Sequence, residues 1–533
     1  MYTSPLTTAR TASRQSRDAG SLRGTMSTWL TQRLTNAEQE QREITLSSRR
    51  AEDLYANDGT ARSGINDICT NAIGTGLIPQ VKLPYKILGI SQEQASELQE
   101  QMEWAFSLWS SEAHVKGIEN FSGLQYCALR SILRNGECFH LPVSVPLVAG
   151  RTFSLALQDI SPHRVMTPVD KILDPMIRTG IRLSPHGAPV SYFIATPLPS
   201  LMPLDYSVNS LTSQYFQERP AKIGHRPNIF HLFRYEDEEQ VRGVSALAPS
   251  IKLFRNLADC IDYELFAQVI AASFPLFIET ESANALEAAK DMYNIGGGND
   301  GTEKQFLQLD LREGGISIGA PGQKPHILES KRPSANFASF TDIVLRAISA
   351  SLGTSYESLT KDFTKANYSA ARAAMNEAWK TYKMYRRWFA ARYCQPIFEM
   401  VMEEALLRGM FRLPTGLNDF YARQNLWCNV TWVGPARGFV DPVKEIQAVI
   451  MSLQNGLMTF EDAWAERGED FDEGLETMRE ERKRLSSLAP LTLSAQKTLA
   501  PPKHSGLVDD SMETVPTESD ADDADEKKDE SDA

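Results

Sequence analysis

The chain has 533 residues, 42% hydrophobic and 23% charged, which is the composition of a globular protein with several structural units. Its net charge of −13 is concentrated at one end, because residues 509–533 hold twelve acidic residues and two lysines, a net −10 that leaves −3 for the remainder. Neither a run of about 18 uncharged apolar residues nor the apolar segment of a signal peptide is found, so we expect a soluble intracellular chain without a membrane partner.

The N-terminal third begins with a Ser-, Thr- and Arg-rich arm over residues 1–30. Apolar spacing then predicts a helix from Met26 to Asn57 that continues to Ile73, where Gly74 and Gly76 end it. The "GTG" at this point lacks the third glycine and the preceding strand of a dinucleotide-binding turn, so we interpret it as a helix stop.

A helix over Ser91–Phe106 is followed by short runs with alternating apolar residues and Pro/Gly punctuation. These runs predict strands at Glu137–Val145, Thr152–Ile160, Gly180–Pro185, Pro189–Ala195 and Asn228–Arg234. We expect one antiparallel sheet with helices against one face, and hence an α+β domain over residues 31–245.

Two long helices bracket a small insert in the middle of the chain. The first is predicted over 246–272, with Ile251, Phe254, Leu257, Ile261 and Leu265 on one face. Residues 273–333 hold short strand-like runs around "QFLQLDL" and "GGISIGA" and the glycine-rich "GGGNDG". The second helix covers 334–352 and ends at Gly353.

A polar loop is predicted over 353–368, followed by a long helix that starts near Ser369 in the segment 369–439. This helix carries one buried stripe: Met375, Trp379, Tyr382, Phe389, Tyr393, Ile397 and Val401. Pro396 should kink the helix and Gly409 should end it.

The C-terminal part is predicted to be helical over 440–490 and disordered over 491–533, where large apolar residues are almost absent from the acidic end. Such a tail is either a solubilising appendage or a removable or partner-binding segment.

A search for chemistry finds no convincing active site. GxxxxGK[ST], HExxH and the EF-hand pattern are absent, and the "GISIG" at Gly315–Gly319 is followed by "APGQKP" instead of the helix that a nucleophile elbow requires. His225 and His231 lie near the consecutive acids 236–239, which read as a surface loop more than as a metal site.

The cysteines show no metal-binding or disulfide spacing and are interpreted as reduced packing thiols: Cys69, Cys127, Cys138, Cys260, Cys394 and Cys428. We therefore expect no catalytic residues, no metal and no cofactor. Two alternatives stay open, a metal-dependent nuclease that processes DNA and an oligomeric scaffolding protein with long helices.

Three stretches, taken in order and spacing, resemble one family. They are "RRAEDLYANDGTARSGINDICTNAIGTGLIPQ", the junction "HLFR…EEQVRGVSAL", and "ISASLGTSYESLTKDFTKANYSAARAAMNEAWKTYKMYRR". Over residues 49–488 the chain is similar to the portal proteins of tailed bacteriophages, in the lambda-like group. The arm before Arg49 departs from that pattern.

The resemblance implies a ring-forming portal fold at one capsid vertex, usually of about twelve copies. It implies a wing (31–245 and 369–439), stem helices (246–272 and 334–352), a clip (273–333), a tunnel loop (353–368) and a crown (440–490). The implied partners are double-stranded DNA that enters during packaging and leaves during ejection, the terminase large subunit, head-completion and tail connector proteins, and the capsid or scaffold protein. The implied location is the virion, with assembly in the host cytoplasm.

Two sets of residues carry these implied contacts. Lys361, Thr364, Lys365 and Asn367 would face DNA in the tunnel loop, where few, backbone-directed contacts let DNA slide. The alternative for the lysines is simple pairing with Asp362 or Glu357. Gly296, Gly297, Gly298 and Asn299 would lie at the interface of the clip with terminase.

Overall fold

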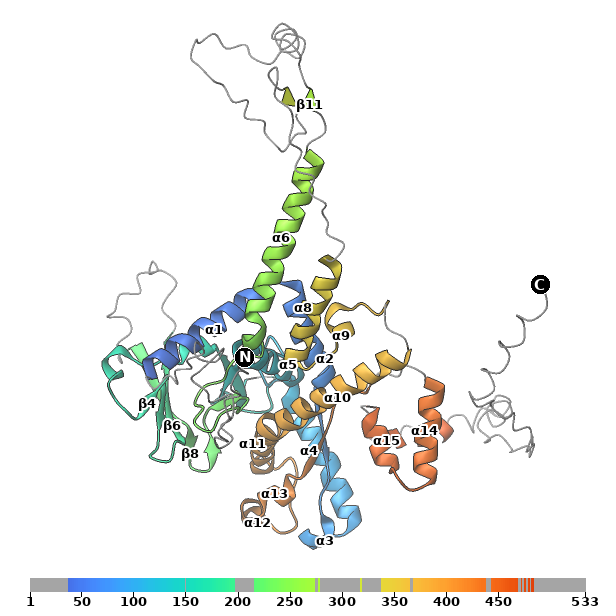
Figure 1. The fold of residues 1–533 in the computed structure, drawn as a ribbon. Coiled ribbons are helices and arrows are strands. Elements are labelled where there is room, and N and C mark those ends of the chain that lie inside the picture. Colours follow the sequence, from blue (N-terminus) through green and yellow to red (C-terminus); the bar gives the residue numbers. More distant parts are fainter. Residues whose placement is uncertain are drawn as a thin grey trace, which may run out of the picture. The chain divides into compact units, whose positions relative to one another are not determined.

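The computed structural model describes residues 37–148, 150–196, 215–273, 277–278, 317–318, 337–364, 368–437 and 442–467, together with scattered helical residues between 471 and 483. The chain divides into two units, Met1–Asp470 and Phe471–Ala533, and the first holds all the elements discussed below (Figure 1).

The helices of the first unit follow the predicted order with some changes of boundary. They are α1 (Ala37–Asn57), α2 (Gly59–Ala72), α3 (Tyr85–Leu88), α4 (Gln92–Ser111), α5 (Phe121–Asn135), α6 (Ile251–Ser273), α8 (Phe337–Leu352), α9 (Tyr356–Thr360), α10 (Tyr368–Phe389), α11 (Gln395–Leu407), α12 (Leu417–Ala422), α13 (Gln424–Trp427), α14 (Pro442–Gln454) and α15 (Phe460–Glu466).

The prediction of one continuous helix up to Ile73 is wrong, because the helix breaks at Asp58 and forms α1 and α2. The Asp58 side chain accepts a hydrogen bond from the backbone N–H of Ala61 and so caps a new helix, α2. The helix α4 begins as predicted after Ser91, which forms a capping box with Gln94.

The strands form antiparallel sheets, but not the single sheet that the sequence predicts. One sheet has the order β10 (Phe230–Phe233), β2 (Glu137–Ser144), β3 (Leu155–Ile160). The other has the order β4 (Ile177–Arg178), β5 (Ile181–Leu183), β6 (Pro189–Ala195), β7 (Phe216–Pro220). Smaller pairs are β1 (Ile78–Val81) with β13 (Val430–Val433), β8 (Lys222–Ile223) with β9 (Arg226–Pro227), and the parallel pair β11 (Phe277–Ile278) with β12 (Ser317–Ile318).

The division into two sheets follows from strand β2, which is apolar on both faces. Cys138 points into the main core, whereas Phe139 and Leu141 belong to a second core that also contains Tyr192 and Ile194 of β6. Because successive side chains of a strand point to opposite faces, β2 needs cover on both sides. Helices supply one cover and the second sheet supplies the other.

The long helix of the sequence prediction is present but locally widened. A π-helical segment, Ala390–Cys394, joins α10 to α11, and the backbone N–H of Gln395 bonds to the carbonyl of Ala390. Pro396 lies immediately after this segment, in the first turn of α11. The predicted stripe is buried at Tyr382, Phe389, Tyr393, Ile397 and Val401, and Gly409 follows the helix end with a φ of 73°.

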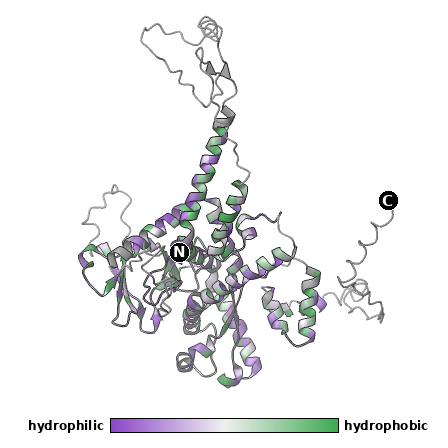
Figure 2. Cartoon of the chain, in the orientation of Figure 1, coloured by the Kyte–Doolittle hydropathy of each residue, from purple (hydrophilic) through white to green (hydrophobic). Residues whose placement is uncertain are grey.

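Helices α6 and α8 lie side by side, and each buries only part of its apolar stripe. Phe254 and Leu257 of α6 are buried, but the predicted stripe residues Ile261 and Leu265 are 44% and 59% exposed. Apolar residues recur along this part of α6 in Figure 2. The core of one chain therefore covers the beginning of the helix and leaves the apolar face at Ile261 and Leu265 exposed, although Glu264 is buried.

Candidate functional site

The predicted polar loop after Gly353 is more ordered than its sequence suggests. The structure describes it as far as Thr364, and residues 356–360 form the short helix α9. Ser355 caps this helix by accepting a hydrogen bond from the backbone N–H of Ser358. Leu359, only 1% exposed, fixes α9 to the main core. The segment is thus a packed turn that carries polar residues.

Two glycines make this packing possible. Gly353 ends α8 with a φ of 70°, a left-handed conformation that strains other residues. Gly64 lies on α2, where a Cβ atom would approach Leu352 Cδ1 to 2.8 Å and Leu359 Cδ1 to 2.9 Å. A side chain at position 64 would therefore require the ends of Leu352 and Leu359 to shift, and the glycine lets α2 lie close to α8 and α9 (Figure 1).

Asp67, one turn along α2, anchors the loop through its buried carboxylate. The Lys361 ammonium lies 2.9 Å from Asp67 Oδ1, and the Thr354 hydroxyl donates to Oδ2 over 2.8 Å. The Tyr382 hydroxyl of α10 donates to the same Oδ2. One carboxylate thus joins α2, the loop and α10.

The surroundings of Asp67 are only partly closed to solvent. Burial, followed by the nearby carboxylate of Asp67, raises the pKa of Tyr382 above its usual range, so this hydroxyl stays a donor. The Lys361 side chain, by contrast, remains 60% exposed while it is paired, and its backbone has a φ of 58°. Its ammonium group therefore faces both the carboxylate and the solvent.

The structure places the residues predicted for the tunnel loop as follows. Lys361 pairs with Asp67, a partner that the sequence alternative, pairing with Asp362 or Glu357, does not name. Asp362 instead accepts hydrogen bonds from the backbone and hydroxyl of Thr364, which is exposed. Lys365 and Asn367, like Gly296, Gly297, Gly298 and Asn299, lie outside the described residues.

A second polar cluster lies where the strands give way to α6. The Arg242 guanidinium donates to both carboxylate oxygens of Glu137 and to the backbone carbonyls of Pro162, Val165 and Thr179. Burial alone would raise the pKa of Glu137, but Arg242 and a hydrogen bond from His231 lower it to about 2. This ion pair joins β2 to the segments around the second sheet.

The two histidines considered for a metal site have separate structural roles. His231 Nε2 lies 2.9 Å from a Glu137 oxygen and its ring stacks on Phe139, whereas the His225 ring contacts Tyr421. Within the part of the chain that the structure describes, no group of three or more His, Cys, Asp or Glu side chains could hold a metal ion. Ser317 of the "GISIG" motif lies on strand β12.

No helix among the described residues is long and apolar enough to cross a membrane.

Sequence reasoning missed the residues that hold these clusters together, Asp67 and the pair Glu137–Arg242. A signal for Asp67 exists, since it stands among Gly64, Ile65 and Ile68 on the buried face of a helix, where a carboxylate needs partners. Which partners it has depends on the tertiary packing.

The family of the chain follows from a comparison with sequence models of known families. Residues 23–386 match the model described as "Phage portal protein, lambda family". The chain belongs to this family. The matched range contains the anchored loop, Asp67 and the Glu137–Arg242 pair, and the role of the protein is therefore that of a phage portal, the head–tail connector.

Individual relatives agree with this assignment. The portal is 25% identical over 451 residues to "Portal protein B" of Escherichia phage lambda, which covers 81% of this chain and 82% of that protein. It is also 25% identical to the "Portal protein" of Escherichia phage N15, with 80% and 81% covered. Among solved structures, a chain in the neck of an empty GTA particle matches 79% of this chain and 93% of its own, at 12% identity and a TM-score of 0.39.

Proposed function

We propose that this portal forms a closed ring of about twelve copies, and that double-stranded DNA passes through its channel during packaging and ejection. The observation that supports the ring is the uncovered face of α6, where Ile261, Leu265 and Phe266 are 44%, 59% and 63% exposed. Apolar side chains gathered in this way mark a surface that a partner covers, and further copies of the chain fit that requirement. The protein acts in the virion after assembly in the host cytoplasm, as a structural component without catalysis.

The size of the particle tests the ring. A closed ring would have a mass of about 700 kDa, about twelve times the chain mass of 59.5 kDa, as measured by mass photometry. Leu265→Asp should reduce the ring fraction at least about tenfold, because a charge would be buried between copies. Arg255→Ala, at a site 81% exposed on the same helix, serves as the control and should leave rings intact. A wild-type chain that stays monomeric at micromolar concentration contradicts the proposal.

Within this ring, we assign residues 31–245 and 369–439 to the wing and helices α6 and α8 to the stem. Residues 273–333 form the clip, residues 353–368 the tunnel loop, and residues 440–490 the crown. The clip docks the terminase large subunit and then the head-completion and tail connector proteins, whereas the crown faces the capsid interior with its scaffold. These assignments rest on the family and on the order of the elements along the chain.

The tunnel loop contacts DNA through Lys361, Thr364, Lys365 and Asn367. The pairing of Lys361 with Asp67 supports a weak contact, because exchanging a carboxylate for a phosphate oxygen gains little free energy. Strong phosphate binding would release many counterions and hold the DNA in place. A partly neutralised lysine instead gives contacts that are sequence-independent and easily broken, as sliding requires.

Lys361→Ala combined with Lys365→Ala should leave ring assembly intact and impair packaging or retention of DNA. Loss of two cations in every copy removes the loop's attraction for the DNA backbone. The measurement is the length of packaged DNA and the phage titre after complementation of a portal-deficient phage. Lys222→Ala with Lys86→Ala, which removes two cations outside the loop and the stem helices, is the control. Normal genome length and titre in the loop double variant would refute the contact.

Deletion of residues 296–301 tests the clip. We expect rings to remain visible by negative-stain microscopy while capture of terminase in a pull-down is lost, because Gly296, Gly297, Gly298 and Asn299 would form part of the docking surface. Undiminished capture of terminase by the deletion variant would show that another segment docks it.

A further inference from the structure

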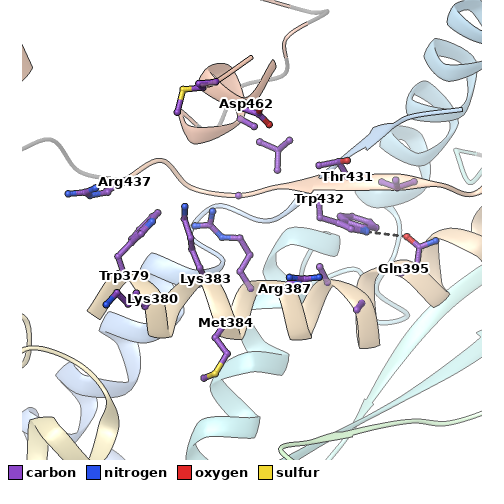
Figure 3. Close-up of a pocket in the computed structure, with 18 of the residues that line it drawn as sticks. Trp379, Lys380, Lys383, Met384, Arg387, Gln395, Thr431, Trp432, Arg437 and Asp462 are labelled. Atoms are coloured by element: carbon purple, nitrogen blue, oxygen red, sulfur yellow. Dashed lines mark hydrogen bonds between the residues drawn. The ribbon is translucent and has the colours of Figure 1, made fainter. Parts of the chain in front are cut away.

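A wide groove, separate from the tunnel loop, runs along helix α10. Its volume is about 1320 Å³, and it is lined by α10, by the segment around β13, and by residues of the α14–α15 hairpin. Figure 3 shows Trp379, Lys383 and Arg387 on one side, Trp432 and Arg437 across from them. All of these residues belong to the first unit of the chain.

The groove is strongly basic. Its lining includes Lys380, Lys383, Arg386, Arg387 and Arg437. Of these, Arg386 has an internal role, because its guanidinium donates to the backbone carbonyls of residues 71, 72 and 435. Lys380, Lys383 and Arg387 are exposed. Lys380 pairs with Glu377 and Arg437 donates to Asn376, whereas within the described part of the chain the Arg387 side chain has no hydrogen bond or ion pair.

One acidic residue, Asp462, lines the groove, and its carboxylate is already engaged. It accepts hydrogen bonds from the backbone and hydroxyl of Thr459 at the start of α15. It therefore caps a helix and does little to neutralise the opposite wall. The groove keeps a positive field that selects an anionic occupant.

Apolar side chains lie between the cations. Trp379 and Trp432 are partly buried against the core, and Leu457, also in the lining, is 83% exposed. An occupant that fits this surface offers carboxylates together with an apolar or aromatic side chain, as the buried centre and polar rim of a protein interface do.

The chain itself presents such a segment on a different side of α10. Residues 235–239, which we call the acidic loop, are all exposed and read Tyr-Glu-Asp-Glu-Glu. Tyr235 is 62% exposed, and the carboxylates of Glu236, Glu238 and Glu239 form no hydrogen bond or ion pair with any residue that the structure describes.

The position of this loop is fixed by the preceding residue. The Arg234 guanidinium lies over the rings of Tyr385 and Trp388, at 5.1 and 5.7 Å from their centroids. At about 100° per residue, these two ring positions point away from the side that carries Lys383 and Arg387. The same guanidinium also lies 3.8 Å from the Met384 sulfur, which lines the groove. The acidic loop therefore begins beside one edge of the groove, on the face of α10 next to the one that carries Lys383 and Arg387.

We propose that the acidic loop of one copy docks in the basic groove of the next copy, an inference that rests on the proposed ring. Two complementary surfaces on different sides of one subunit are what a head-to-tail interface requires, and such an interface closes into a ring when its rotation is right. Glu238 and Glu239 then face Lys383 and Arg387 of the neighbour, and Tyr235 packs near Trp432 and Leu457. Charge complementarity at this contact fixes which neighbour binds and in what orientation.

The acidic residues 509–533 and DNA are two other anions that the groove could take. The tail offers only Met512, Val515 and Pro516 to cover the apolar lining, whereas the acidic loop offers an exposed tyrosine at a fixed position. DNA phosphates would leave the apolar lining uncovered. The loop of a second copy is therefore the better match.

Charge exchange tests the interface. Glu238→Lys with Glu239→Lys, and separately Lys383→Glu with Arg387→Glu, should each reduce the ring fraction in mass photometry at least about tenfold, because like charges then face each other. The four changes together should restore rings to within about twofold of wild type. Glu93→Lys with Glu100→Lys, on the exposed face of α4, is the matched control and should have no effect.

Disulfide cross-linking distinguishes the acidic loop from the two other candidate occupants of the groove, residues 509–533 and DNA. Glu238→Cys together with Arg387→Cys should give disulfide-linked ladders on a non-reducing gel, and neither single variant should. Ladders that persist after truncation at residue 508 and after nuclease treatment support the acidic loop of a second copy as the occupant of the groove. Ladders that disappear when the tail or the DNA is removed contradict this proposal. If the wild type forms rings, the charge-reversal variants also form rings and no ladders appear, this interface is refuted and the ring is not. If the wild-type chain is a monomer, both the ring and this interface are refuted.

Discussion

Replacing Arg242 by alanine is expected to lower the free energy of unfolding of this portal by about 3–5 kcal/mol, because the substitution leaves the buried Glu137 carboxylate without its cation. Glu137 and Arg242 are only 2% and 6% exposed, so water cannot replace the lost partner. Three backbone carbonyls that accept from the guanidinium also lose their donor. Urea unfolding followed by circular dichroism measures the change.

Two comparisons make this expectation specific. Arg255→Ala, at an exposed site, should change stability by less than about 0.5 kcal/mol. Glu137→Leu combined with Arg242→Met should recover much of the loss, since neither charge then stays buried alone. A loss below about 1 kcal/mol for Arg242→Ala would contradict a stabilising role of the pair.

The same pair predicts a dependence of stability on pH. The pKa of Glu137 falls from an ordinary value of 4.5 to about 2 in the folded chain. The folded state therefore holds this carboxylate ionised where the unfolded state protonates it, and folding is favoured above pH 4.5. This contribution should decrease as the pH falls from 4.5 toward 2, and Glu137→Gln should remove that part of the pH dependence.

Asp67→Ala should release the loop of residues 353–364, the proposed tunnel loop, from α2. The change deprives Lys361, Thr354 and Tyr382 of their common acceptor. We therefore expect the free energy of opening the loop to decrease by about 3 kcal/mol. Hydrogen exchange of the backbone amides of residues 353–364 should then accelerate about a hundredfold, since each 1.4 kcal/mol corresponds to a factor of ten.

Asp53→Ala, which removes an exposed carboxylate of α1 that bonds Asn57, is the matched control and should leave this exchange unchanged. Asp67→Asn keeps a side-chain acceptor and should give an intermediate acceleration. If the loop amides exchange at the wild-type rate in Asp67→Ala, then Leu359 and the core around α9 hold the loop without help from the carboxylate.

Periodicity predicted the long helices well, because their stability depends on an apolar face that repeats along the sequence. The buried positions Phe389, Tyr393 and Ile397 were predictable in this way, and so was the stop at Gly409. Helix α5 is absent from the predicted elements, although Asn120 caps its start and Gly136 ends it in a left-handed conformation. Both cap signals are local features of the sequence.

The tertiary pairings were not predictable. Asp67 and Lys361 are 294 residues apart in the sequence, and Glu137 and Arg242 are 105 apart. Local spacing carries no information about such partners, and so the alternative considered for Lys361 named only its sequence neighbours Asp362 and Glu357. The exposure of Ile261 and Leu265 was equally hidden, because a periodic stripe does not distinguish cover by the same chain from cover by another copy.

The π-helical segment between α10 and α11 has a consequence for insertions and deletions. A π turn holds one residue more than the α-helical path between the same end points, and Ala390–Cys394 contains that surplus. Removing one residue there would restore the α-helical path and keep the orientation of α11, whereas inserting a further residue would rotate α11 by about 100° relative to α10. Glu404, which accepts from the backbone of Ser154 and Leu155, would then turn away from them. Laboratory evolution of this portal should therefore accept a one-residue deletion in the segment more readily than a one-residue insertion.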